Sequence, residues 1–142
     1  MYSVALFMIF CILKAEGYII EKSAMKKKIL LAEDDQAIVE VVKIILEQDG
    51  YAIIAADSEQ AIHAALDEHK PDLILLDIWL SGHDGGEIAK LLKAKRETQH
   101  IPIIMISANN ETEKIAKESN ADDFLLKPFD IDDLLRIVRK YC

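Results

Sequence analysis

Leu73-Ile74-Leu75-Leu76-Asp77 is the stretch of sequence that decides the predicted fold. Its four apolar residues follow one another without polar alternation, which is typical of a strand buried on both faces, as in parallel sheets covered by helices. Pro71 stops the preceding segment, and the acidic residue Asp77 closes the strand. The sequence therefore predicts a central parallel strand with a carboxylate at its carboxyl end.

Three further apolar runs also end on polar residues that can carry chemistry. Residues 29–32 run into Glu33-Asp34-Asp35, residues 101–106 into Ser107, and residues 124–126 into Lys127-Pro128. The carboxyl ends of parallel strands meet at one edge of a sheet, and open α/β sheets bind their ligands at that edge. These side chains are therefore expected to lie close together.

Strand and helix patterns alternate along the chain from Lys27 onward. Buried strands are expected at residues 28–32, 51–56, 72–76, 101–106 and 122–126. Helices are expected at residues 36–48, after Asp57 or Ser58, and at residues 84–95, 111–119 and 130–141. Such units predict an α/β fold, a doubly wound five-stranded parallel sheet of order 2-1-3-4-5 with helices on both faces. In this order the first and third strands are neighbours.

Composition restricts the classes of protein that fit. The chain has 142 residues, 51% of them hydrophobic, which is enough for one domain with a sizeable core, expected at residues 26–142. The net charge of −8 argues against a nucleic-acid-binding surface. Cys11 and Cys142 show no pairing pattern and fit free thiols in a reducing compartment, which favours the cytoplasm.

Residues 1–25 differ from the rest and are predicted to be an N-terminal extension. The ten apolar residues 4–13 are too few to span a bilayer as a helix, so no membrane is expected as a partner. A signal peptide is the minority interpretation, because no Lys or Arg precedes the apolar stretch. Met25 opens a sequence that reads like a natural start, so the extension is interpreted as a misplaced start or an element packed on the domain.

The residues expected at the sheet edge suit phosphoryl transfer with a divalent cation. Clustered carboxylates raise one another's pKa values unless a cation is present. Mg²⁺ suits Glu33, Asp34 and Asp77 best, because it takes few carboxylates and keeps waters that a phosphoryl group can replace. A carboxylate beside the metal can attack phosphorus and form an aspartyl phosphate. Lys127 offers a positive charge and Ser107 a hydroxyl donor.

Four segments together resemble the receiver domain of bacterial two-component response regulators, the CheY-like family, over residues 26–142. They are LLAEDD at residues 30–35, LLDIWLSGHDG at 75–85, PIIMISA at 102–108 and ADDFLLKPF at 121–129. The ordered set of four motifs is highly specific. The resemblance implies a flavodoxin-like fold and a phosphorylation-driven switch that signals by docking to other proteins.

The resemblance also implies roles for the matching residues. Asp77 accepts a phosphoryl group from a phosphohistidine on a sensor kinase or phosphotransfer protein, and Lys127 contacts that group. The Mg²⁺ ligands are Glu33, Asp34, Asp77 and the backbone carbonyl of Trp79, and the switch residues are Ser107 and Phe124. A downstream protein reads the face made by the fourth helix, fifth strand and fifth helix. The chain is then no enzyme beyond its own phosphorylation and dephosphorylation, and is a monomer or a phosphorylation-dependent dimer.

Several positions depart from the family pattern. Ser81 stands where proline is frequent, which is expected to loosen the loop after the acceptor, and Asn120 stands where glycine is common. Phe124 lacks the hydroxyl of the more usual tyrosine. Trp79 and Asn109 hold positions that tune loss of phosphate in the family. A bulky indole that shields the phosphoryl group predicts a longer-lived phosphorylated state.

Four functions compete for this sequence, and the first is a stand-alone receiver. A haloacid-dehalogenase-type phosphatase needs a second Asp two residues after the nucleophile, where this chain has Trp79. A flavodoxin-like cofactor carrier conflicts with Glu33-Asp34-Asp35, which repels a flavin phosphate. The alternative that stays open is a receiver-fold interaction or dimerisation module that does not use phosphorylation.

The histidines and the single tryptophan are not expected to form a site of their own. His63, His69, His83 and His100 lack the convergent spacing of metal ligands and are expected at the surface or in loops, with His83 the closest to the acceptor. Trp79 is expected to be a partly buried aromatic residue of the acceptor loop.

Overall fold

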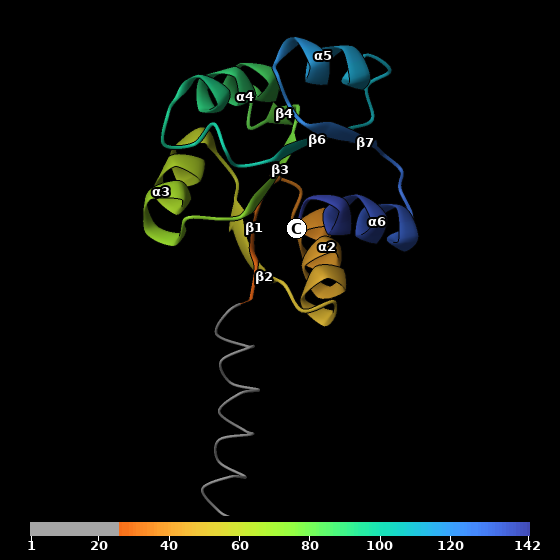
Figure 1. The fold of residues 1–142 in the computed structure, drawn as a ribbon. Coiled ribbons are helices and arrows are strands. Elements are labelled where there is room, and N and C mark those ends of the chain that lie inside the picture. Colours follow the sequence, from red (N-terminus) through yellow and green to blue (C-terminus); the bar gives the residue numbers. More distant parts are fainter. Residues whose placement is uncertain (1–25) are drawn as a thin grey trace, which may run out of the picture.

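A five-stranded parallel sheet forms the centre of residues 26–142, the part of the chain that this computed structural model describes (Figure 1). The strands are β1 (Lys28–Ala32), β2 (Ala52–Ala56), β3 (Leu73–Asp77), β6 (Ile103–Ser107) and β7 (Asp123–Leu126), and their spatial order is β2-β1-β3-β6-β7. The predicted order 2-1-3-4-5 is thus confirmed. The predicted N-terminal extension, residues 1–25, lies outside the described residues.

Helices cover both faces of the sheet, as predicted. They are α2 (Gln36–Gln48), α3 (Glu59–His69), α4 (Gly85–Ala94), α5 (Thr112–Glu118) and α6 (Ile131–Tyr141). Figure 1 shows α2 and α6 on one face and α3, α4 and α5 on the other. Two buried clusters match this division, because Ile74 and Leu76 of β3 belong to one and Leu73 and Leu75 to the other.

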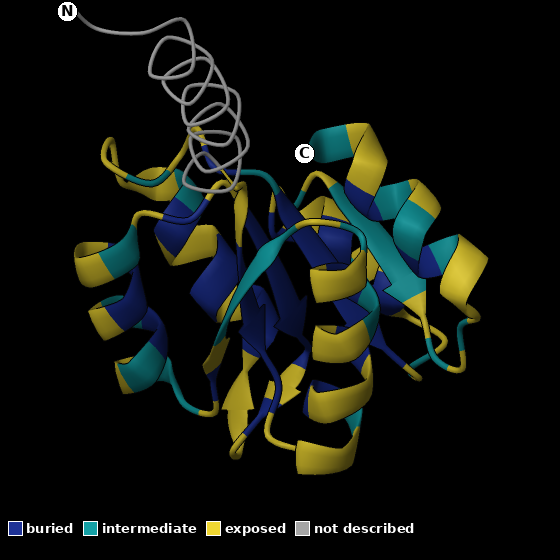
Figure 2. Ribbon diagram, turned by 90° about the horizontal axis from the view of Figure 1, so that it is seen from below, coloured by how far each residue is buried: buried dark blue, intermediate teal, exposed yellow. Residues whose placement is uncertain are grey.

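The central position of β3 explains its sequence. This strand pairs with β1 on one side and β6 on the other, and all five of its residues are buried. Figure 2 shows the central strands in the buried colour and the outward faces of the helices in the exposed colour, whereas the edge strands β2 and β7 are mostly intermediate. The continuous apolar run is therefore the pattern of a strand covered on both faces.

Helix ends follow the polar residues that the sequence indicated. Asp35, Ser58 and Asp130 each accept backbone N–H groups in the first turn of α2, α3 and α6. Gly50 follows α2 with a φ of +96°, and Asn120 follows α5 with a φ of +61°, the left-handed region that these residue types tolerate best. Ser58, rather than Asp57, caps the N-terminus of α3.

A small hairpin between β3 and α4 was not predicted. It consists of β4 (Trp79–Leu80) and β5 (His83–Asp84), paired antiparallel. Its two central residues, Ser81 and Gly82, both have positive φ, at +50° and +79°. Two-residue hairpin turns of type I′ require positive φ at both central residues, which Ser81 and Gly82 adopt. Within residues 26–142, no helix has both the length and the apolar character needed to cross a membrane.

Candidate functional site

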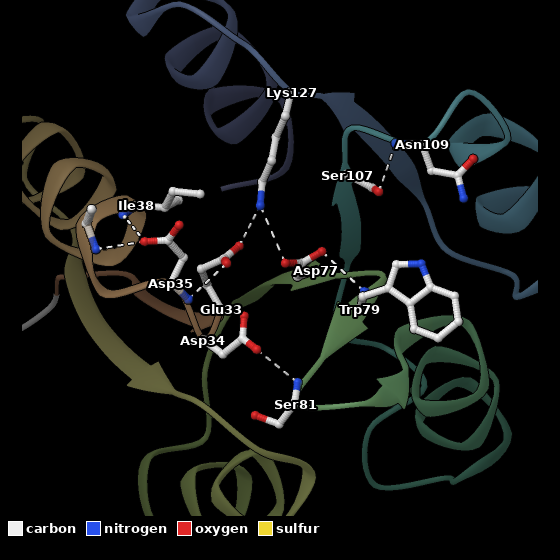
Figure 3. A network of polar contacts seen from close by, with 11 residues as sticks. Glu33, Asp34, Asp35, Ile38, Asp77, Trp79, Ser81, Ser107, Asn109 and Lys127 are labelled. Atoms are coloured by element: carbon white, nitrogen blue, oxygen red, sulfur yellow. Dashed lines mark hydrogen bonds and ion pairs between the residues drawn. The ribbon is translucent and has the colours of Figure 1, made fainter.

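The carboxyl ends of four sheet strands bring the predicted site residues together (Figure 3). Glu33 and Asp34 follow β1, Asp77 closes β3, Ser107 closes β6 and Lys127 follows β7. Glu33, Asp77 and Ser107 are buried although they are polar. Buried polar groups need partners, so the contacts among these side chains define what the site can bind.

Three carboxylates form the centre of the site. Glu33, Asp34 and Asp77 each offer an oxygen, and these oxygens all lie within 4.8 Å of one another. Among residues 26–142 this is the only such group of three or more metal-ligating side chains. The first and third strands are neighbours at this edge, which is why residues distant in sequence converge here.

Lys127 links two of these carboxylates. Its Nζ donates to Glu33 Oε2 at 2.8 Å and to Asp77 Oδ2 at 3.4 Å. Burial by itself lowers the pKa of Lys127, but the hydrogen bond to Glu33 and the charges of Asp77 and Glu33 outweigh it, so the pKa lies above its ordinary value. The lysine therefore stays charged and neutralises part of the acidic cluster.

The pKa of Glu33 is set by burial and by its two charged neighbours. Burial raises the pKa of its carboxyl, the hydrogen bond from Lys127 lowers it, and the neighbouring Asp77 raises it again, so that the pKa ends above its ordinary value. A carboxylate with a raised pKa gains from a nearby cation.

The chemistry of this donor set fits a hard divalent cation. Three carboxylates against one ammonium leave an excess of two negative charges when all groups are ionised. All the side-chain donors are oxygens, the ligands that Mg²⁺ prefers. Glu33, Asp34 and Asp77 therefore match Mg²⁺ in charge and in ligand type.

Backbone N–H groups of the hairpin hold the acidic side chains. Trp79 N donates to Asp77 Oδ1 at 3.2 Å, and Ser81 N donates to Asp34 Oδ2 at 3.1 Å. The Ser81 hydroxyl also donates to the Asp57 carbonyl at 2.5 Å. The expectation that Ser81 loosens this loop is therefore not met, because its two hydrogen bonds tie the hairpin to the loops after β1 and β2.

Gly85 packs directly behind the acceptor strand. A Cβ placed there would collide with the backbone carbonyl oxygen of Asp77 and would lie 2.9 Å from Ile78 Cα. Gly85 N donates to the Ile78 carbonyl at 2.5 Å. Gly85 thus lets the start of α4 approach β3 closely, and no local signal in the sequence reveals such a contact.

The two predicted switch residues lie on neighbouring strands. Ser107 Oγ accepts from Asn109 N at 3.1 Å, and Lys127 N donates to the Ser107 carbonyl at 2.9 Å. Phe124 on β7 is half-buried and packs against the core cluster beneath α3, α4 and α5. The backbone thus connects the ends of β6 and β7 beside Asp77.

Trp79 is more exposed than predicted. The residue is 59% exposed, and Figure 3 shows the indole turned away from the Asp77 carboxylate. The expectation of a partly buried loop aromatic is wrong, because the neighbouring Leu80, and not Trp79, fills the core beneath the hairpin.

An apolar hollow opens next to Lys127. It has a volume of about 520 Å³ and is lined by Ala37, Ile38, Val41, Val42, Ala108, Lys127, Pro128 and Phe129. Val41 is one of the large hydrophobic residues that remain exposed in residues 26–142. No local sequence pattern indicates this surface, since its residues come from α2 and two loops.

The chain belongs to the response regulator receiver domain family, whose model matches residues 29–139. The phosphate regulon transcriptional regulatory protein PhoB of Pseudomonas aeruginosa is 40% identical over 111 residues, 77% of this chain and 48% of PhoB. The transcriptional regulatory protein KdpE of Staphylococcus aureus is 38% identical over 117 residues, 81% of this chain and 49% of KdpE. The chain spans about half the length of these curated relatives.

Solved structures agree with this assignment. The chemotaxis response regulator CheY4 of Vibrio cholerae superposes with a TM-score of 0.76 at 23% identity, covering 83% of this chain and 100% of CheY4, and shows the same fold. The receiver domain of the sensor histidine kinase PA1611 from Pseudomonas aeruginosa has a TM-score of 0.74 at 25% identity, covering 82% of this chain and 97% of that domain. That structure is described with a magnesium ion coordinated in the active-site cleft.

Proposed function

We propose that this receiver works as a phosphorylation-driven switch in which Asp77 accepts a phosphoryl group from a phosphohistidine. The donor is a sensor histidine kinase or a phosphotransfer protein, and the reaction depends on Mg²⁺. The observation that carries the proposal is the cluster of Glu33, Asp34 and Asp77 with Lys127 bonded to two of its members.

In the transfer step, a carboxylate oxygen of Asp77 attacks phosphorus. The phosphorus–nitrogen bond of the donor breaks, its electron pair leaves with the imidazole, and an aspartyl phosphate forms. Trp79 N holds Asp77 Oδ1, which orients the carboxylate for attack. Lys127 Nζ, 3.4 Å from Asp77 Oδ2, is in position to donate to the transferred oxygens.

Mg²⁺ would be held by Glu33, Asp34 and Asp77, with the backbone carbonyl of Trp79 as a further ligand. When bound, the ion supplies positive charge that offsets the negative charge of the phosphoryl oxygens. The magnesium described in the PA1611 receiver supports this assignment by analogy.

The proposed switch begins at Ser107. Its hydroxyl accepts from Asn109 N in this structure and would instead donate to a phosphoryl oxygen on Asp77. Because Lys127 N is bonded to the Ser107 carbonyl, movement of residues 107–109 would be transmitted to β7 and Phe124. The output face would then be α5, β7 and α6, read by a downstream protein.

The apolar hollow beside Lys127 supports a protein as the phosphoryl donor. A phosphohistidine must reach Asp77, so its carrier has to cover this edge of the sheet. Val41 and Phe129 offer apolar contact next to Lys127. The reaction is proposed to take place in the cytoplasm, where a free thiol such as that of Cys142 stays reduced.

Independent action, without an attached output domain, stays a prediction. The relatives named as transcriptional regulators are about twice as long as the region they share with this chain. Three further properties also stay predictions from the sequence. The chain is proposed to have no nucleic acid or membrane partner and to act on no substrate other than itself. It is proposed to be a monomer or a phosphorylation-dependent dimer. The alternative remains a receiver-fold interaction module that does not use phosphorylation.

The chain's single tryptophan, Trp79, gives a direct test because it lies two residues after Asp77. Mg²⁺ added to the full chain should change the Trp79 emission, and acetyl phosphate should cause a second change only when Mg²⁺ is present. Asp77→Asn should abolish the second change, and Asp67→Asn, an exposed carboxylate on α3, should retain both. A response to acetyl phosphate that persists in Asp77→Asn would contradict the proposal.

A further inference from the structure

Two imidazoles from different segments approach one carboxylate outside the phosphoacceptor site. His63 Nε2 lies 3.7 Å from Glu59 Oε1, and both residues belong to α3. His83 Nδ1, on β5, lies 3.7 Å from Glu59 Oε2. The sequence predicted unrelated surface histidines, because nothing local reveals that the hairpin packs against the first turn of α3.

We propose that Glu59, His63 and His83 form a binding site for a transition metal ion of the Zn²⁺ class. Imidazole nitrogen and carboxylate oxygen are the usual ligands of Zn²⁺, Ni²⁺ and Cu²⁺. Mg²⁺ prefers oxygen ligands alone, so this set selects against the ion assigned to the acidic cluster. Three protein ligands leave a fourth position of a tetrahedral ion to water.

The observed separations are close to those that a bound ion requires. Zn²⁺ holds nitrogen and oxygen ligands at about 2.0–2.2 Å, which places two ligand atoms of a tetrahedral ion about 3.4 Å apart. Both nitrogen–oxygen separations at Glu59 are 3.7 Å. Each His–Glu pair therefore already has nearly the spacing of two ligands on one ion.

Binding all three ligands to one ion requires side-chain rotation. The two imidazoles approach opposite oxygens of Glu59, and only the acidic cluster has three mutually close ligand atoms in residues 26–142. The side chains of His83 and His63 are 59% and 39% exposed, so both imidazoles reach solvent and neither belongs to the buried core. The site closes when the ion binds.

The backbone that carries these ligands is already in place. Glu59 and His63 are four residues apart, which puts them on one face of α3 on successive turns. The hairpin that carries His83 is tied to the start of α3 by the hydrogen bond from Ser81 to the Asp57 carbonyl. An ion at this site would add a second link between α3 and the segment that follows Asp77.

Calorimetric titration of Zn²⁺ into the full chain tests this inference. Excess Mg²⁺ fills the acidic cluster, and replacement of Cys11 and Cys142 by serine removes thiolate competition. One Zn²⁺ should bind per chain. His63→Ala and His83→Ala should each weaken binding by about tenfold to a hundredfold or more, since loss of an outer partner of a ligand already costs that much.

The chain offers matched controls. His69 also lies beside a glutamate, with its Nε2 3.8 Å from Glu68 Oε2. His69→Ala and His100→Ala should therefore leave Zn²⁺ binding unchanged. Absence of Zn²⁺ binding in excess Mg²⁺, or affinity unaffected by His83→Ala, would overturn the three-ligand site. Asp77→Asn should retain Zn²⁺ binding, which makes the result independent of the phosphoacceptor.

Discussion

Lys127 decides the electrostatic state of the acidic cluster. Its ammonium bonds to Glu33 and Asp77 and leaves Asp34 to the backbone N–H of Ser81. One positive charge among three carboxylates reduces their mutual repulsion when no divalent ion is bound. The remaining negative charge can still be balanced by such an ion. The same lysine lies where a phosphoryl group on Asp77 would need a donor.

Replacement of Trp79 with alanine is expected to shorten the life of the phosphorylated state severalfold. The indole points away from Asp77 in this structure, but turned over a phosphoryl group it would exclude water, whereas alanine cannot. The decay of the phosphorylated mass with time measures this effect. Leu91→Ala, which removes an exposed apolar residue of α4, is the control. Equal decay in Trp79→Ala and the unmodified chain would contradict the shielding hypothesis.

Gly85→Ala is expected to lower the free energy of unfolding by about 1–3 kcal/mol, the usual cost of overpacking. Its Cβ would meet backbone atoms of Asp77 and Ile78, which cannot move aside without shifting β3. At Gly86 a Cβ would meet side-chain atoms of Asp84 and Ile115, each at 3.0 Å, so Gly86→Ala should cost less. Urea unfolding compares the two variants, and an equal or smaller loss for Gly85→Ala would refute the close-packing argument.

At this scale the sequence predicts the residues that end strands and misses those defined by spatial neighbours. Asp77, Ser107 and Lys127 can be identified from the sequence because each follows a buried apolar run. The contact of Gly85 with β3 and the approach of His83 to Glu59 depend on how the hairpin packs. No periodicity or local propensity encodes such contacts.

At the scale of elements, α2 and α6 are joined by an ion pair on their shared face of the sheet. Arg139 donates to both oxygens of Asp49, through Nε at 3.0 Å and Nη2 at 2.6 Å. Asp49 caps the carboxyl end of α2, and Arg139 lies in the last turn of α6. The hydrogen bonds from Arg139 lower the pKa of Asp49 below its ordinary value.

This lowered pKa predicts a pH-dependent contribution to stability. Because the folded pKa of Asp49 lies below the unfolded one, the pair stabilises the fold above about pH 3.9 and loses its effect as the pH falls through the folded value. Arg139→Ala should therefore destabilise the protein at neutral pH and have little effect in acid. Arg136→Ala, which removes an exposed pair within α6, controls for helix effects. Urea midpoints that shift equally at both pH values would contradict the assignment.

The strands with long apolar patterns were predicted correctly, whereas the two-residue strands of the hairpin were not predicted. The central strands were identifiable because parallel strands covered on both faces read as continuous apolar runs. β4 and β5 have two residues each, too few to show alternation. The strand expected from residue 101 begins at Ile103, because Pro102 has no N–H to donate to the sheet.

At the scale of the whole molecule, folding itself assembles the acidic cluster. Glu33 and Asp77 lie far apart along the sequence and meet only because β1 and β3 pair. Mg²⁺ should therefore bind the folded chain in preference to the unfolded one and stabilise it. The gain is about 2.7 kcal/mol when the ion is at one hundred times its dissociation constant.

Thermal unfolding with and without Mg²⁺ measures this stabilisation. Asp34→Asn removes one ligand from the cluster without removing the phosphoacceptor and should abolish most of the gain. Asp67→Asn should retain it. A melting temperature that rises equally with Mg²⁺ in Asp34→Asn and the unmodified chain would show that the ion acts elsewhere on the molecule.

The central claim is that Asp77 takes a phosphoryl group in a Mg²⁺-dependent reaction, and intact mass after incubation with acetyl phosphate tests it most directly. The account predicts one added phosphoryl group per chain when Mg²⁺ is present, and none when Mg²⁺ is withheld or Asp77 is replaced by Asn. Asp67→Asn should behave like the unmodified chain. No addition to the folded protein under any condition, or an addition that persists in Asp77→Asn, would contradict the account.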